Sequence, residues 1–217
     1  MSTAQLGGGA SGTGSLLLQA PNTNSAQTVT FPDATGNVVI DSATQTLTNK
    51  TIQGGTITSG TLQASTSGTS ITFTGIPSWA KRITVMFNGV STTGSSTLGI
   101  RLGTASGIVS TGYNGSAADL VNTGTVVSAT DTTVLLIGAG SPTQSPSSIR
   151  YGMAIISLID SSTNTWVHTG SLGFSNTSMT TNFGGRIALS GVLTQLSITS
   201  VAGADTFDAG SINILYE

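Results

Sequence analysis

Four pairs of a threonine and a branched aliphatic residue recur at an unbroken spacing of five: Thr46-Leu47, Thr51-Ile52, Thr56-Ile57 and Thr61-Leu62. On a strand this spacing turns successive aliphatic side chains to opposite faces, and on a helix it separates them by roughly 140°. Neither element gathers the four aliphatics into one core. Each aliphatic residue points inward only if the chain winds, either on itself as a solenoid or with identical chains about a shared axis.

The length of the repeat decides between these two architectures. Four pentads supply about one coil of a square solenoid, whereas roughly three stacked units are needed before a repeat array is stable. In a trimer the same residues form apolar layers on the threefold axis: Leu47, Ile52, Ile57 and Leu62. We therefore expect residues 16–66 to form a short intertwined trimeric β-stalk, with chance periodicity in a threonine-rich linker as the alternative.

The first fifteen residues are small, polar and rich in glycine. Such a composition buries too little apolar surface to offset the entropy of ordering the chain. Residues 1–15 are therefore either a floppy terminus or an arm that becomes ordered by docking onto another protein. We interpret residues 1–15 as a flexible attachment arm. The short apolar pieces over residues 16–40 are interpreted as strands that pair with a partner outside this segment.

From about residue 67 onward, apolar residues alternate with polar ones. The clearest groups are Ile71/Phe73, Ile83/Val85/Phe87, Leu98/Ile100/Leu102, Ile187/Leu189 and Ile212/Ile214/Tyr216. Further candidate strands are residues 133–137, 153–159, 165–168, 172–174 and 196–201, and turn-like breaks include Asn88-Gly89, Asn114-Gly115 and Gly184-Gly185. A period of two is typical of half-buried strands. The sequence predicts an all-β protein in which residues 67–217 form a jelly-roll-like β-sandwich.

Charge is unusually scarce, which argues against two classes of partner. Charged residues make up 6% of the chain and the formal net charge is -2, against about 25% charged residues in an average soluble domain. No cluster of basic residues offers a surface to nucleic acid or to an anionic membrane. No apolar run approaches the roughly 20 residues of a membrane span, and no basic segment followed by an apolar run begins the chain. We expect no nucleic-acid partner and no membrane insertion.

The residues that carry most enzyme chemistry are also scarce. The chain has no cysteine and one histidine, His168, so the three or four protein ligands of a zinc site are lacking. No serine lies in a Gly-x-Ser-x-Gly elbow, and the one close acidic pair of the sandwich region, Asp205 and Asp208, is better explained by turn formation. We predict no catalytic residues, no metal, no cofactor and no enzymatic activity. Cleavage of polysaccharide, which uses two facing carboxylates, is the least favoured alternative.

Four aromatic residues are candidates for stacking on sugar rings: Trp79, Tyr113, Tyr151 and Trp166. Packing in the core or at a subunit interface is the favoured explanation of such rings. Tyr113 precedes the turn-like pair Asn114-Gly115 and is therefore expected to be the most exposed. We name Tyr113, Asn114 and Trp166 as candidate receptor contacts.

Two stretches carry a resemblance to a known class of proteins. The segments Ser15-Leu-Leu-Leu-Gln-Ala-Pro-Asn-Thr-Asn24, Val29-Thr-Phe-Pro-Asp-Ala-Thr-Gly-Asn-Val-Val-Ile40 and Thr46-Leu-Thr-Asn-Lys-Thr-Ile52 resemble segments that recur in tailed-phage fibre and appendage proteins. Residues 73–90 through 205–216 look like a C-terminal head domain found on many such fibres. Together the two matches cover most of the chain.

The resemblance implies a homotrimer whose N-terminal arms bind other virion proteins of the capsid or tail, with Leu6, Leu16, Leu17 and Leu18 as candidate anchor contacts. It places the protein on the virion surface after assembly in the host cytoplasm, with sandwich heads directed toward a host-surface glycan. The chain departs from long tail fibres in having only residues 16–66 for a shaft. A stubby appendage for host attachment is the resulting expectation, and a capsid decoration or head fibre protein that stabilises the shell is the alternative.

Overall fold

A computed structural model of the chain describes residues 57–140 and 142–217, and within these ranges all regular structure is β-strand. The expected attachment arm, the anchor residues Leu6 and 16–18, and the pentad residues Leu47 and Ile52 lie outside the described residues. Because the described part contains no helix, it holds no helical membrane span. The predicted all-β class is confirmed.

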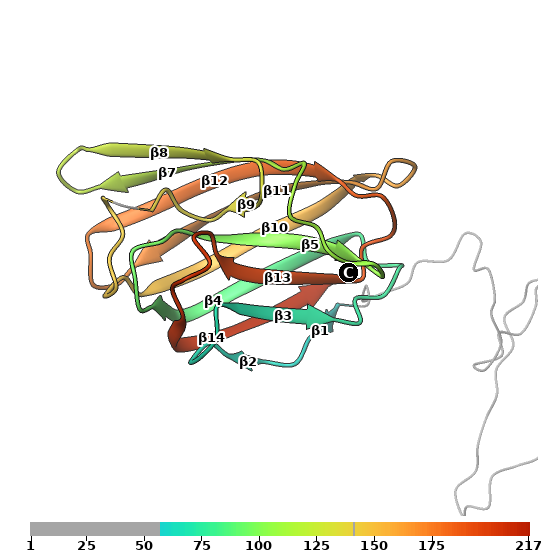
Figure 1. Cartoon of the computed structure of the whole chain (residues 1–217), viewed down its shortest axis with the longest axis horizontal. Coiled ribbons are helices and arrows are strands. Elements are labelled where there is room, and N and C mark those ends of the chain that lie inside the picture. The colour runs from blue at the N-terminus through green and yellow to red at the C-terminus, as the bar shows by residue number, and fades with distance from the viewer. Residues whose placement is uncertain (1–56, 141) are drawn as a thin grey trace, which may run out of the picture. The chain divides into compact units, whose positions relative to one another are not determined.

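The strands form two antiparallel sheets, which we call the large and the small sheet (Figure 1). The large sheet comprises β1 (Thr58–Ser59), β2 (Gln63–Ala64), β4 (Arg82–Thr92), β7 (Asn114–Val121), β8 (Val126–Asp131), β10 (Arg150–Asp160), β11 (Thr165–Phe174), β12 (Met179–Ala188) and β14 (Phe207–Tyr216). The small sheet comprises β3 (Ser70–Thr74), β5 (Leu98–Thr104), β6 (Gly107–Ile108), β9 (Leu135–Leu136) and β13 (Gln195–Ser200).

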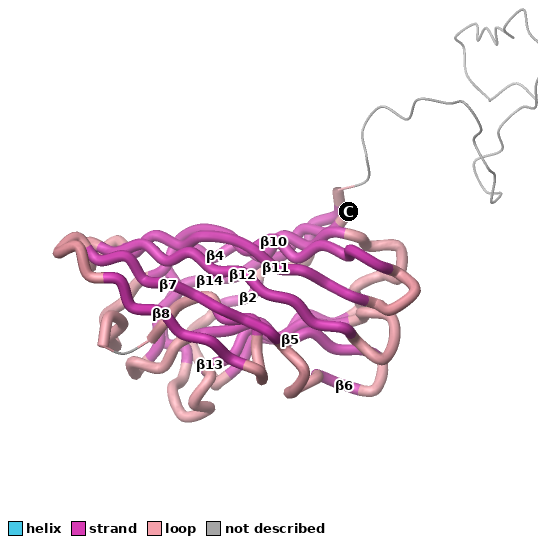
Figure 2. Tube along the Cα trace, turned by 90° about the horizontal axis from the view of Figure 1, so that it is seen from above, coloured by secondary structure: helices cyan, strands magenta, loops and turns pink. Residues whose placement is uncertain are grey.

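Some neighbouring strands are consecutive in the sequence, such as β10, β11 and β12, and others come from distant parts of it. The large sheet runs β1-β14-β4-β10-β11-β12-β7-β8, with β2 also paired to β14. The small sheet runs β3-β13-β5-β6, with β9 also paired to β5. Figure 2 shows the two layers from above, in an arrangement consistent with a β-sandwich.

One apolar core lies between the sheets and explains the alternation in the sequence. In β4, Ile83 and Val85 are fully buried while Thr84 between them is partly exposed. The small sheet contributes Ile100 and Ile198, which face each other across the β5–β13 pair and are also fully buried. Each inward apolar side chain leaves water on folding, at about 25 cal/mol per Å² of apolar surface.

Residues 58–64 form a short, bulged edge of the large sheet beside the last strand. Thr58 pairs with Tyr216 and Ala64 pairs with Ser211, with the register shifting by one residue between β1 and β2. The amide of Gln63 donates to the carbonyl of Thr72 in β3 at 2.9 Å, which ties this edge to the small sheet. The final two pentads, assigned to the stalk from the sequence, therefore extend along the sandwich.

Three glycine-containing pairs that the sequence analysis read as turns lie inside strands, and those predictions are wrong. Asn88-Gly89 is in β4, Asn114-Gly115 begins β7, and Gly184-Gly185 is in β12. Gly89 has a φ of 69° and lies opposite a register shift between β4 and β10, which marks a β-bulge. A Cβ on Gly185 would lie 2.6 Å from the carbonyl oxygen of Asn114 on the neighbouring strand. Close backbone approach explains Gly115 and Gly185, and a β-bulge explains Gly89.

Candidate interaction surfaces

Tyr113 is buried, so the expectation that it is an exposed receptor contact is wrong. Its side chain is 1% exposed. The phenol oxygen accepts a hydrogen bond from the Leu102 amide at 2.8 Å, and its hydroxyl donates to the Val109 carbonyl at 2.8 Å. Burial raises the pKa of Tyr113 to about 12, partly opposed by the Leu102 hydrogen bond. The tyrosine fastens the start of β7 to β5 from inside the sandwich.

Trp166 is also buried, so the prediction that it is a receptor contact is wrong. The indole is 3% exposed, because alternation along β11 turns Trp166 inward and Val167 outward. Its ring N–H has no hydrogen-bond partner among the described residues. The ring therefore belongs to the core, and packing in the core or at a subunit interface was the favoured explanation for all four aromatics.

His168 lies on the same inward face of β11, as expected for a strand residue. Its ring is 3% exposed and stacks on Phe183, with the ring centroids 4.8 Å apart and an interplanar angle of 12°. Neither ring nitrogen has a hydrogen-bond partner among the described residues. Burial alone lowers the pKa of His168 to about 3. The imidazole is therefore neutral at neutral pH and is part of the core.

A buried polar network that the sequence analysis missed joins Asp119, Gln144 and Arg150. The Asp119 carboxylate accepts hydrogen bonds from the Ala139 amide at 3.0 Å, the Thr143 hydroxyl at 2.6 Å and the Gln144 amide at 3.1 Å. The Gln144 oxygen in turn accepts a 2.7 Å hydrogen bond from the Arg150 guanidinium. Asp119 is fully buried and Arg150 is 1% exposed.

The charge of Arg150 is held inside the protein by these partners and by an aromatic ring. Its guanidinium carbon lies 5.5 Å from the centroid of the Phe174 ring. Burial lowers the pKa of Arg150 to about 10, and the negative charges of Asp119 and Asp208 oppose this shift. Both ends of the connection between β9 and β10 are thereby fixed to the large sheet, which gives the network a structural role.

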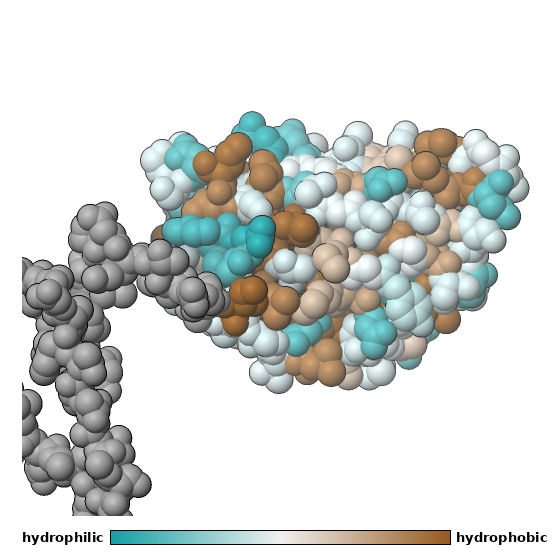
Figure 3. Space-filling model, turned by 180° about the vertical axis from the view of Figure 1, so that it is seen from behind, coloured by the Kyte–Doolittle hydropathy of each residue, from teal (hydrophilic) through white to brown (hydrophobic). Residues whose placement is uncertain are grey.

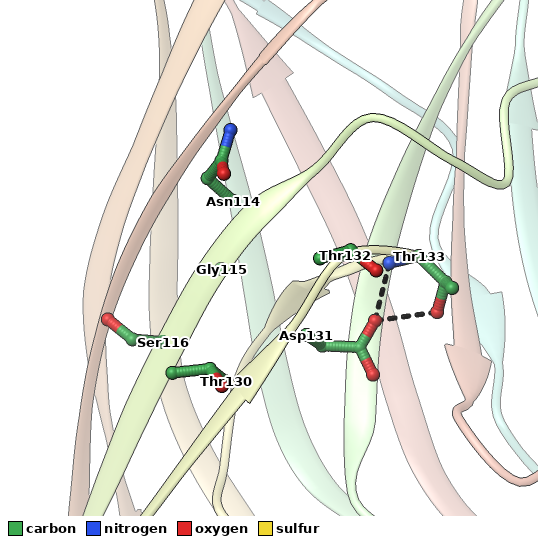
Figure 4. Close-up of a pocket in the computed structure, with 7 residues that line it drawn as sticks. All are labelled: Asn114, Gly115, Ser116, Thr130, Asp131, Thr132 and Thr133. Carbon is green, nitrogen blue, oxygen red and sulfur yellow. Dashed lines mark hydrogen bonds between the residues drawn. The ribbon is translucent and has the colours of Figure 1, made fainter.

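An open hollow of about 470 Å³ lies where β7 and β8 meet the turn after β8 (Figure 4). It is lined by Asn114, Gly115, Ser116, Thr130, Asp131, Thr132 and Thr133. Asp131 accepts hydrogen bonds from the amide and hydroxyl of Thr133, at 2.5 Å and 2.6 Å. Of the three predicted receptor contacts, Asn114 alone is exposed, and it lies in this hollow. Hydroxyls, an amide and the Asp131 carboxylate give the hollow hydrogen-bond donors and acceptors suited to a polar ligand such as a sugar.

Asp205 and Asp208, at the start of the last strand, accept hydrogen bonds from β4 and from the connection that follows it. Asp205 accepts from the Ser96 amide at 2.7 Å, and Asp208 accepts from the Ser91 hydroxyl. The carboxylates thus bind a neighbouring segment, and not their own turn as the sequence analysis expected. No group of three acidic or histidine side chains suited to a metal ion occurs in residues 57–140 and 142–217.

Exposed apolar side chains lie along the edge formed by β1 and β2 and at the end of the sandwich where residue 57 enters. Ile57 and Leu62 are 61% and 63% exposed, and Trp79 is 48% exposed. The Trp79 ring lies against Tyr216, with centroids 5.6 Å apart and planes inclined at 52°. Arg82 and Glu217 form an ion pair at the same end of β4. This end therefore offers apolar and aromatic surface beside a paired charge.

No protein-family model matches this chain, and no curated protein or solved structure is significantly similar to it.

Proposed function

We propose that this chain is a non-enzymatic structural protein of a tailed phage, a homotrimeric appendage on the virion surface. Its N-terminal arm would bind other virion proteins, and its three sandwiches would face the host surface for attachment. The observation that carries the proposal is the exposure of Ile57 and Leu62, the last two aliphatic residues of the pentad repeat, at 61% and 63%. The resemblance of the flanking segments to phage appendage proteins supports a place for the trimer on a phage particle.

The orientation of the pentads along the sandwich supports a shared axis. Thr58 and Gln63, which follow the aliphatics directly, are half-buried against the chain's own strands, and Gln63 bonds to β3. The polar residues thus turn toward the sandwich while Ile57 and Leu62 turn away from it. A single soluble chain normally has the reverse pattern, since burial of an apolar side chain contributes about 1.5–3 kcal/mol. Other copies of the chain, with the same repeat in register, would bury these residues.

We further infer that the sandwich is a jelly roll. The chain crosses between the sheets on passing from β3 to β4 and from β4 to β5, and again from β12 to β13 and from β13 to β14. These crossings place β13 between β3 and β5, and place β4 between β14 and β10. Strands brought beside distant partners by such crossings are typical of paired Greek keys.

Host attachment would use polar, low-charge surface such as the hollow that contains Asn114. A site of hydroxyls and amides binds one glycan weakly, and three linked copies raise the effective affinity when their sites engage together. Because the protein has few charged residues to form ion pairs with a ligand, the strength of such adhesion would vary little with salt concentration.

Antibodies raised against residues 57–217 test the proposal on purified phage particles. We expect label on a tail or capsid appendage, and slower adsorption of the phage when the host is first incubated with the purified protein. Capsid label combined with a weakened shell after removal of the protein, and with unchanged adsorption, would favour the decoration role instead. Particles that carry no label would contradict a place on the virion.

A further inference from the structure

The outer face of the large sheet carries an apolar strip across its central strands. We define the strip by the outward residues Met86 of β4, Tyr151, Met153 and Ile155 of β10, Val167 of β11 and Leu215 of β14. Tyr151, Met153 and Val167 are 43%, 49% and 36% exposed. Figure 3 views this side of the molecule, where apolar brown surface lies among pale hydroxyl-bearing residues. Large apolar side chains at adjacent positions form a patch, which is more informative than scattered single residues.

The register of the sheet makes the strip continuous. Met153 lies directly opposite Met86 on β4, and Ile155 lies opposite Thr84, which itself pairs with Leu215. On the other side of β10, Ser157 faces Val167. Directly opposed outward side chains in an antiparallel pair have their Cβ atoms about 5 Å apart. The strip therefore spans β14, β4, β10 and β11 without a gap wider than one short polar side chain.

Charges border the strip on two sides: Arg82 pairs with Glu217 at one end, and Arg186 of β12 is exposed directly opposite Val167. None of the six residues of the strip is charged. An apolar centre with a polar and charged rim is typical of the surfaces that bury against another protein.

The strip is continuous with the pentad repeat. Ser59 pairs with Leu215, so strand alternation places Ile57, two residues earlier, on the same outer face. Ile57 is 61% exposed and stands where the preceding 56 residues join the sandwich. The edge itself is short and bulged at residues 60–62, a form that discourages pairing with a further strand. Association would therefore proceed through the side chains of the outer face.

We propose that this apolar strip is covered by further copies of the chain, so that the three sandwiches contact one another directly through the outer faces of their large sheets. The proposal rests on the trimeric appendage proposed above and adds the surface that its heads share. The outer face of the small sheet and the hollow that contains Asn114 would point away from these contacts and stay accessible.

Single cysteines in the cysteine-free, full-length chain test the proposal. Met153→Cys and Val167→Cys probe the strip, and Ser128→Cys is the matched control, because Ser128 is exposed on β8 at the far edge of the same sheet. The measured quantities are the solution mass of each variant and the rate of its reaction with a water-soluble maleimide. We expect a mass of three chains for all variants and labelling at Met153→Cys at least about tenfold slower than at Ser128→Cys, which corresponds to about 1.4 kcal/mol of protection.

The outcomes separate this inference from the proposed function. A mass of three chains with equal labelling rates at the strip and the control would overturn head-to-head contact and leave a trimer held elsewhere. A mass of one chain with fast labelling would overturn both proposals. Slow labelling in a single chain would mean that the chain's own N-terminal 56 residues cover the strip, which contradicts coverage by second copies. Val167→Cys decides the result if Met153→Cys disturbs folding.

Discussion

Mild acid should destabilise the sandwich through one buried residue. His168 is 3% exposed, and neither of its ring nitrogens has a partner among the described residues. Burial lowers its pKa from 6.5 to about 3 in the folded chain. Once the chain unfolds, the imidazole meets water and returns to its ordinary pKa. Between these two pKa values the unfolded chain binds a proton that the folded chain excludes.

The size of the effect follows from proton linkage. Stability is complete above pH 6.5 and falls by about 1.36 kcal/mol for each pH unit below it, until the folded-state pKa is reached. At pH 5 the loss is about 2 kcal/mol, and the full loss below pH 3 is about 5 kcal/mol. A loss of about 2 kcal/mol is a substantial part of the roughly 5–15 kcal/mol by which most domains are stable.

Denaturant unfolding at fixed chain concentration measures this loss between pH 7.5 and pH 5, followed by fluorescence of the buried Trp166. His168→Leu is the comparison, because an apolar residue of similar size carries no proton and stays beside Phe183. We expect the wild type to lose about 2 kcal/mol over this range and the variant to lose much less. Equal pH dependence of the two proteins would refute the assignment to His168.

Three further predictions concern stability at pH 7.5, measured by denaturant and thermal unfolding. Tyr113→Phe leaves a buried backbone amide of β5 without its partner and should lower stability by about 1–3 kcal/mol. Arg150→Met removes the buried cation of the polar network and should lower stability by about 3–5 kcal/mol, whereas the double variant with Asp119→Asn should lose less than the sum of the two single losses. Gly99→Ala places a methyl group against a fully buried valine and should lower stability by about 1–3 kcal/mol, whereas Gly173→Ala, with no atom within 4 Å of its new Cβ, should stay within about 0.5 kcal/mol of the wild type.

Each of these predictions has a contrary result. Strictly additive losses in the double variant would mean that Arg150 and Asp119 act independently. An unchanged unfolding midpoint for Tyr113→Phe would remove the role given to the phenol hydroxyl. Similar losses at Gly99 and Gly173 would contradict the assignment of the Gly99 loss to crowding by Val134.

The periodicity of the sequence predicted the strands of the core well, because burial of one face of a strand places an apolar residue at every second position. Ile83, Val85 and Phe87 lie in β4 and are buried, and Ile212 and Ile214 lie in β14 and are buried. The same logic failed for β8 at the sheet edge, because Val126 and Val127 are adjacent there and no residue of the strand is buried. The strand order could not be predicted either, since alternation says nothing about which strands become neighbours.

The predicted receptor contacts were less accurate than the predicted core strands, for a physical reason. Tyr113 was placed at the surface because Asn-Gly is typical of turns, but the same residue types occur where strands approach closely. A Cβ on Gly115 would lie 2.7 Å from the Val134 carbonyl oxygen, and this crowding becomes visible only once both strands are placed. The network of Asp119 and Arg150 was missed because the two residues are distant in sequence and meet through the fold.

Light scattering of the full-length chain tests the central claim most directly. We predict a mass of three chains, and a lower mass when Ile57→Asp or Leu62→Asp places a carboxylate among the exposed pentad side chains, with Thr61→Asp as the neighbouring control that keeps three chains. A wild-type mass of one chain over a wide concentration range would contradict the trimeric appendage.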